Sequence, residues 1–201
     1  MKTNKILIIF ILLCSFHAFS QEENTSLETE TASVEKSMFS VQAGLLPGVW
    51  INEEIKLANP ISLRFEAGAN YGTGSGGFTD NGTISVWVAN FRLEPRYYYN
   101  LGRRIGKGKD ISNNSGNFLA LAFNYVPKDG ILFSNTQNLM VSNSFTFVPN
   151  YGIRRNIGKN FNYETGFGVG LYYVPPDSRS FGAKQSSGII VELHLRIGYT
   201  F

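Results

Sequence analysis

One histidine near the C-terminus is the residue best placed to carry chemistry. His194 has Glu192 and Arg196 two positions away on either side, so the three side chains share one face if the segment is an extended strand. Hydrolysis of a lipid ester would need a nucleophile such as serine, a histidine and a carboxylate that all face the lipid. His194 lies between Leu193 and Leu195 and therefore faces away from the apolar side of the strand. We expect it to join a polar network, and we predict no catalytic residue.

The other residues with catalytic or binding potential also favour structural roles. The aspartates fall in expected connections and form no pair on one strand, which argues against paired-carboxylate catalysis: Asp80, Asp110, Asp129 and Asp177. The glycine-rich segment Gly72–Gly77 lacks the Lys-Ser/Thr ending of a phosphate-binding loop, and no helix is expected after it. We expect a loop there, and we predict neither a metal ion nor a cofactor.

The first twenty residues are organised like a secretory signal peptide. Lys2 and Lys5 form a charged start, Ile6–Leu13 is an unbroken apolar run, and the small residues Ala18 and Ser20 stand at the expected cleavage site. The apolar run is too short to cross a bilayer as a helix. A buried N-terminal helix and a lipid-modified cysteine are the alternatives to a cleaved signal.

Removal of residues 1–20 changes the composition of the chain. Two of the 18 basic residues are lost, which leaves 16 against 15 acidic ones, and the single cysteine, Cys14, is lost with them. Disulfides and Cys-ligated zinc are then excluded, and a nearly neutral chain gives no electrostatic argument for nucleic acid. The following segment, Gln21–Ser37, is rich in Glu, Ser and Thr and predicts a flexible acidic arm in the periplasm.

From Met38 onward, large apolar residues occur at every second position. In Ile189–Phe201 one face is wholly apolar and aromatic, while the other face carries mostly polar, charged or small residues. Such a period of two predicts β-strands. The same alternation defines five further strands: Pro60–Tyr71, Thr83–Tyr99, Gly116–Val126, Leu139–Ile153 and Asn160–Val174.

The segment Met38–Leu57 adds either one long strand or two short ones. If Pro47-Gly48 is a tight turn, Met38–Leu46 and Val49–Leu57 form a hairpin, although Glu53 interrupts the apolar face of the second strand. Two strands give a total of eight, an even number that places both chain ends on the same side. One strand gives a total of seven, an odd number that would place the two chain ends on opposite sides.

The polar faces of these strands carry a balanced set of charges. Four Arg and four Glu, with one His, are expected to point away from the apolar face: Arg64, Glu66, Arg92, Glu94, Arg96, Glu164, Glu192, His194 and Arg196. This arrangement is inverted for a soluble barrel, which hides its large apolar residues inside. A transmembrane barrel exposes its apolar face to lipid and pairs its charges in the lumen. We therefore predict an all-β, antiparallel, up-and-down, eight-stranded transmembrane β-barrel over residues 38–201.

One connection does not fit this scheme. Asn100–Ser115 should be a short turn on the side of the chain ends, but it has sixteen residues and carries Arg103, Arg104, Lys107 and Lys109. These basic residues could meet lipid phosphates or could simply be solvated. We leave their role open.

The chain resembles small bacterial outer-membrane β-barrel proteins of the eight-stranded, OmpA/OmpX-like kind. Its ending is similar to the signal that the barrel-assembly machinery reads: Leu193, Leu195, Ile197, Tyr199 and Phe201. The segment Leu93–Gly102 also resembles parts of uncharacterised outer-membrane proteins. The resemblance implies a monomer in the outer membrane of a Gram-negative cell envelope, with outer-membrane lipid and the assembly machinery as partners. Interface aromatic residues would include Tyr97, Tyr99, Tyr125 and Tyr173.

Such barrels do not share one activity. We expect a non-enzymatic barrel with a structural, adhesive or loop-mediated binding role, and the sequence names no extracellular ligand. A barrel enzyme acting on outer-membrane lipid and a narrow pore are the alternatives. The balanced charges favour a plugged lumen, because an unpaired buried charge is costly.

Overall fold

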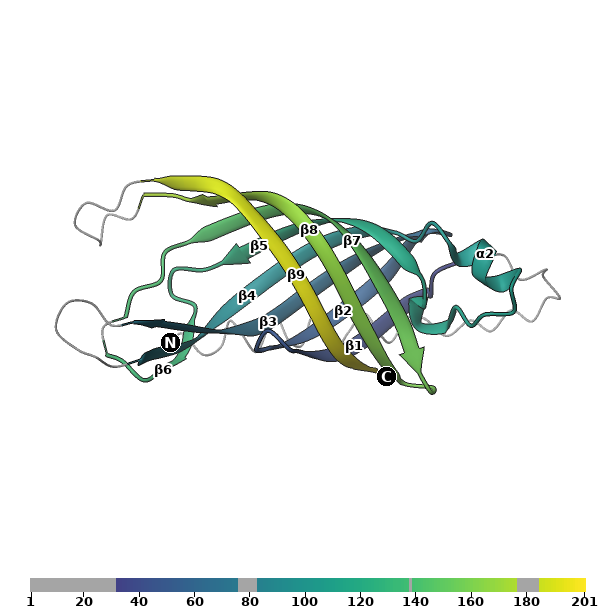
Figure 1. Ribbon diagram of the computed structural model, residues 1–201, viewed down its shortest axis with the longest axis horizontal. Helices are drawn as coiled ribbons and strands as arrows, with labels where there is room; N and C mark the ends of the chain where they lie inside the picture. The colour runs from purple at the N-terminus through teal and green to yellow at the C-terminus, as the bar shows by residue number, and fades with distance from the viewer. Residues whose placement is uncertain (1–31, 76–82, 138, 177–184) are drawn as a thin grey trace. The chain divides into compact units, whose positions relative to one another are not determined.

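The computed structural model describes residues 32–75, 83–137, 139–176 and 185–201. Antiparallel strands make up most of this part of the chain (Figure 1). The predicted signal peptide, most of the predicted arm and parts of the long connections lie outside the described residues. The strands are β1 (Ser37–Gly44), β2 (Gly48–Ala58), β3 (Ile61–Ser75), β4 (Thr83–Tyr97), β5 (Asn117–Val126), β6 (Ile131–Ser134), β7 (Ser144–Ile157), β8 (Phe161–Val174) and β9 (Ser186–Thr200).

Eight of these strands close into a ring. Each pairs with the next in the order β1, β2, β3, β4, β5, β7, β8 and β9, and β9 pairs with β1 from Ser40↔Thr200 to Gly44↔Arg196. All these pairings are antiparallel. The predicted all-β fold with eight consecutive antiparallel strands is therefore confirmed. The residues before β3 form two strands, as the hairpin prediction required, and not one.

Several predicted boundaries are wrong. β7 starts at Ser144 instead of Leu139 and continues to Ile157, because its register with β8 runs on from Arg154↔Glu164 to Ile157↔Phe161. Arg154 therefore lies within a strand, although we expected a connection to start there. The short strand β6 was not predicted. It extends the pairing of β4 at Val86–Val88, beyond the stretch where β4 pairs with β5.

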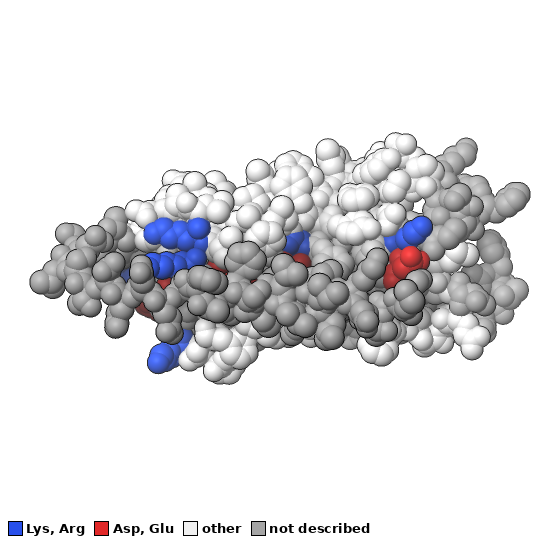
Figure 2. All heavy atoms as spheres, turned by 180° about the vertical axis from the view of Figure 1, so that it is seen from behind, with Lys and Arg blue, Asp and Glu red and all other residues white. Residues whose placement is uncertain are grey.

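The alternation of side chains follows the predicted pattern. Every second residue of each ring strand points into the ring, and most of these residues are buried, while the large apolar residues between them are mostly exposed. In β9, for example, exposed Leu193 and Ile197 alternate with buried His194 and Arg196. On the face shown in Figure 2, the described surface over the strands is almost free of charged residues, and most of the visible Lys and Arg gather at the end that carries α2 (Leu101–Ile105).

The long connection from β4 to β5 covers one end of the ring. It contains α2 and a 3-10 turn, η2 (Ser112–Asn114). Leu101 of α2 packs in a buried apolar cluster with Tyr98, Phe118 and Val34. This covering role explains the length of Asn100–Ser115, which the sequence pattern did not explain.

The described end of the predicted arm also joins this cover. The Val34 amide donates to the Asn59 carbonyl at 2.8 Å, and the Glu35 amide donates to Oδ1 of Asn114 at 2.7 Å. Because Val34 is buried with the apolar cluster, residues 32–36 are fixed against the end of the ring. No helix among the described residues is long and apolar enough to span a membrane.

Glycines inside the ring make room for large side chains. Trp50 of β2 points inward and lies over the backbone of Gly44, Gly48 and Gly68, where its ring atoms occupy the space that a Cβ would need. The guanidinium of Arg196 lies over the same indole, 4.1 Å from the ring centroid. The inward glycines of neighbouring strands therefore determine where this indole can lie.

We predict that Gly68→Ala destabilises the fold by about 1–3 kcal/mol, because the new methyl group overlaps both the indole of Trp50 and the carbonyl of Val49. Gly72→Ala, on the same strand, is the matched control, since its nearest atom, Cγ1 of Val86, is at an ordinary 3.7 Å. Denaturant unfolding of the refolded variants measures the difference. Equal stability of the two variants would show that Trp50 is not packed as described.

Candidate functional site

The polar interior of the ring is the candidate functional site, and Glu164 lies at its centre. Glu164 of β8 is fully buried and accepts hydrogen bonds from Arg64 at 3.0 and 3.2 Å and from Arg96 at 2.9 and 2.8 Å. Nε2 of His194 is 3.5 Å from the same carboxylate. Both carboxylate oxygens are thus held by two guanidinium groups, one from β3 and one from β4, on the opposite side of the ring.

A second cluster lies closer to α2 and centres on Glu54. Oε1 of this buried carboxylate accepts hydrogen bonds from Ser62 at 2.6 Å, Tyr98 at 2.9 Å and Asn114 at 2.8 Å. Arg154 donates to Oε2 at 3.0 Å. The side chain of Asn114 thus links the covering connection to the charges of the interior.

A third cluster lies on the far side of Glu164 from α2. Arg92 forms ion pairs with Glu94 and with Glu192, the second at 2.6 Å. Arg196 donates to Glu66 at 2.6 Å, and Glu66 also accepts from Arg64 at 2.6 Å. Through Arg64, this cluster is continuous with the one around Glu164.

All nine residues of the predicted polar network lie inside the ring. Eight of them are buried, and Glu192 is partly exposed. Sequence analysis missed two charged members, Glu54 and Arg154. With them, the described interior contains five arginines and five glutamates: Arg64, Arg92, Arg96, Arg154, Arg196, Glu54, Glu66, Glu94, Glu164 and Glu192.

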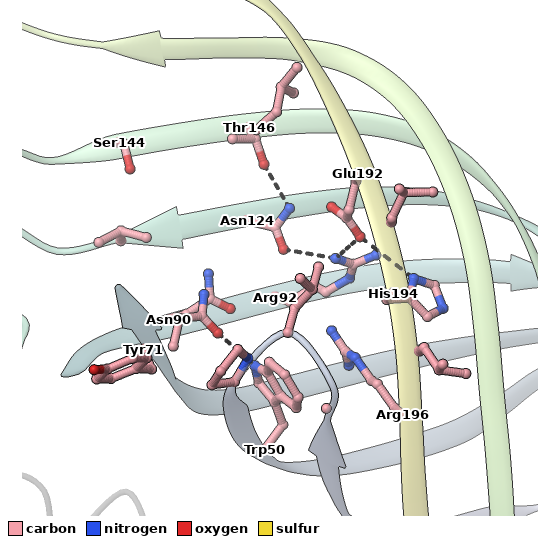
Figure 3. A pocket seen from close by; sticks show the side chains of 18 residues that line it. Trp50, Tyr71, Asn90, Arg92, Asn124, Ser144, Thr146, Glu192, His194 and Arg196 are labelled. Carbon is pink, nitrogen blue, oxygen red and sulfur yellow. Dashed lines mark hydrogen bonds and ion pairs between the residues drawn. The ribbon is translucent and has the colours of Figure 1, made fainter. Parts of the chain in front are cut away.

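A cavity of about 490 Å³ lies beyond the third cluster (Figure 3). Arg92, Glu192 and His194 line it from one side, and Asn90, Asn124 and Thr146 contribute amide and hydroxyl groups, of which Asn124 donates to Thr146 at 2.7 Å. Trp50 adds an aromatic surface and donates to Asn70 at 3.1 Å. Such a lining can hold water or a small polar molecule.

The cavity does not assemble a catalytic triad. His194 lies near two carboxylates, Glu164 at 3.5 Å and Glu192 at 3.8 Å. Ser144 also lines the cavity, but Figure 3 shows it on β7, well away from the imidazole. Among the described residues, no group of three His, Cys, Asp or Glu side chains could hold a metal ion.

The other predicted site residues lie on the outside of the ring. The proposed assembly signal forms one exposed stripe along β9 and the residue after it: Leu193, Leu195, Ile197, Tyr199 and Phe201. Of the predicted interface aromatic residues, Tyr97, Tyr99 and Tyr173 are exposed, and Tyr125 stacks on Phe145 with ring centroids 5.0 Å apart.

No family model, curated protein or solved structure matches the chain. The function must therefore be argued from the geometry of the ring, its interior and its outer surface.

We predict that Glu164→Gln costs about 3–5 kcal/mol in the free energy of unfolding, because it leaves Arg64 and Arg96 without their shared counter-charge. The matched control is Glu53→Gln on the outer face of β2, where we expect a change below about 1 kcal/mol. Urea unfolding of the refolded variants gives both values. Unchanged stability of Glu164→Gln would indicate that water, and not the ion-pair network, compensates these arginines.

Proposed function

We propose that the protein is a bacterial outer-membrane β-barrel whose apolar exterior faces lipid and whose interior is closed by ion pairs. In this proposal the barrel is not an enzyme. It serves a structural, adhesive or loop-mediated binding role in the cell envelope, as a monomer. Outer-membrane lipid surrounds it, and the barrel-assembly machinery is its partner during biogenesis.

The observation that carries the proposal is the distribution of side chains across the wall of the ring. Large apolar residues on all eight strands of the ring point outward and are exposed, for example Phe65, Phe91 and Phe167, which are 43%, 49% and 52% exposed. Soluble monomers rarely expose continuous apolar surface of this extent. The charged residues are instead inside, where they pair. Lipid is the environment in which an apolar outer face and a charged, paired interior are both favourable.

Aromatic residues on the outer face support the same conclusion. Near the α2 end, Phe161, Tyr199 and Phe201 form a contact chain with ring centroids 5.1 and 5.0 Å apart. Towards the other end, Tyr125 stacks on Phe145, which lies opposite exposed Tyr173 on β8. Aromatic residues towards both ends of the apolar wall are typical of a barrel that crosses two membrane interfaces.

The proposed orientation follows from the connections. β1 starts and β9 ends at the end that carries α2, and this end is periplasmic if the barrel is inserted in the usual direction. The connections β3–β4, β5–β7 and β8–β9 then face the cell exterior, where a loop-mediated binding role would reside, while the longer β4–β5 connection lies at the periplasmic end.

A plugged interior distinguishes this proposal from the two alternatives. The ion pairs around Glu54 and Glu164 join β2, β3, β4, β7 and β8 across the ring, so they fill the interior that a pore would need to keep open. A lipid-modifying enzyme would need its histidine on the lipid face, and His194 is inside.

Cell fractionation tests the proposal. We expect the protein in the outer-membrane fraction, and we expect the unheated protein to migrate differently from the boiled protein on gels, because a closed barrel stays folded in detergent. Recovery from the soluble periplasmic fraction, with no heat-dependent shift in migration, would contradict a membrane barrel.

Planar-bilayer recordings separate the plugged barrel from a narrow pore. We predict no steady single-channel conductance for the purified wild-type protein, because the charge clusters block the interior. Glu54→Gln combined with Arg154→Gln removes one opposed pair without changing the net charge, and should not produce steady channels while the Glu164 cluster remains. Regular conductance steps from the wild type would favour the pore.

A further inference from the structure

We propose that the connection between β4 and β5 carries a binding site for the phosphate of an anionic phospholipid headgroup. The site is a small pocket of about 130 Å³ beside α2, outside the interior network. The inference rests on the proposed membrane location, and it adds a specific lipid contact at the periplasmic end of the barrel.

Five cationic side chains line this one pocket. Arg103, Arg104, Lys107 and Lys109 come from α2 and the residues after it, and Arg155 comes from the end of β7, with two amide side chains, Asn100 and Asn117, beside them. Of the residues that the structure describes, no acidic side chain lines the pocket. Figure 2 shows that blue side chains gather at this end of the molecule. Arg155 was not part of the basic group identified in the sequence, because it is 46 or more positions away along the chain.

Two of the guanidinium groups are fixed by hydrogen bonds to neighbouring groups. Arg104 donates to the carbonyl of Asp110 at 2.7 Å and to Oγ of Ser115 at 3.2 Å. Arg155 donates to Oδ1 of Asn117 at 2.5 Å and to the carbonyl of Arg154 at 2.6 Å. These acceptors are neutral, so they orient both cations without cancelling their charge.

The other three cations keep their donors free. Within the described part of the chain, Arg103, Lys107 and Lys109 form no side-chain hydrogen bond or ion pair. Five positive charges around so small a pocket repel one another. An anion in the pocket would relieve this repulsion and accept hydrogen bonds from these side chains.

The carboxylate that follows Lys109 in the sequence, Asp110, is held by other contacts. Asp110 accepts hydrogen bonds from the backbone and the hydroxyl of Ser112, both at 2.8 Å, and from Asn156 at 2.9 Å. Slight burial alone would raise its pKa, but these hydrogen bonds, together with the charge of Arg104, lower it. Asp110 therefore stabilises the turn and does not line the pocket.

The surroundings of the pocket favour a lipid as the source of the phosphate. Asn117 donates to the hydroxyl groups of Tyr151 at 2.7 Å and Tyr99 at 3.1 Å, and both tyrosines are exposed on the outer face. Exposed Leu119 follows two positions further along β5. A lipid whose phosphate lies in the pocket would have its headgroup beside the tyrosines and its acyl chains along the apolar wall.

Native mass spectrometry of the refolded protein in detergent tests the site, with dioctanoyl-phosphatidylglycerol and dioctanoyl-phosphatidylcholine as probes. We expect the wild type to retain phosphatidylglycerol in preference to phosphatidylcholine. Arg103→Gln with Lys107→Gln should weaken retention roughly 20- to 30-fold, on the basis of about 1 kcal/mol for each basic residue. The matched control, Lys56→Gln with Lys128→Gln, removes the same charge elsewhere and should change retention by less than about twofold.

Three outcomes would overturn the inference. Equal retention of the two lipids, or equal loss in both double variants, would mean that no specific anionic-lipid site exists. Displacement of the bound lipid by millimolar inorganic phosphate would assign the pocket to a free anion instead. Because these measurements are made in detergent, a protein that fractionates with the outer membrane but shows no lipid preference refutes only this inference. A soluble protein that still prefers phosphatidylglycerol refutes only the membrane location.

Discussion

The compensation of charge inside the ring is the constraint on which the rest of the structure depends. Glu164 cannot be buried alone, since a carboxylate away from water loses more in desolvation than one weak contact returns. Arg64 and Arg96 approach it from across the ring, and each of them also contacts a second glutamate, Glu66 or Glu94. This sharing requires β3, β4 and β8 to face one another, which an open sheet would not achieve.

Closure of the ring and the apolar outer face follow from the same arrangement. Because the inward-facing residues of the strands are mostly polar, the Leu, Ile, Phe and Tyr residues face outward. Among the residues that the structure describes, no second layer covers them. The pairing of β9 with β1 leaves neither of the two terminal strands with a free edge. In our proposal lipid provides the missing layer.

Much of this architecture could be predicted from the sequence because a period of two assigns each residue to a face. On each strand, the predicted network residues lie at every second position and face the interior. The same rule could have found Glu54, which follows inward-facing Trp50 and Asn52 at every second position. We instead took Glu53 as a break in the strand. Arg154 was missed because the end of β7 was placed too early. The cover formed by α2, Asn114 and Val34 has no periodic signal, since it depends on contacts between distant residues.

The alternation of lipid and interior positions is the central claim, and spin labels measure it most directly. Single cysteines would be introduced, in a Cys14→Ser background, at outward Ile189, Val191 and Ile197 and at Ile190 and Thr146, which line the cavity. In phospholipid vesicles, the account predicts that the outward labels collide preferentially with oxygen dissolved in the bilayer, and the two cavity labels with a water-soluble nickel chelate. Equal access of both quenchers at all five positions would contradict it.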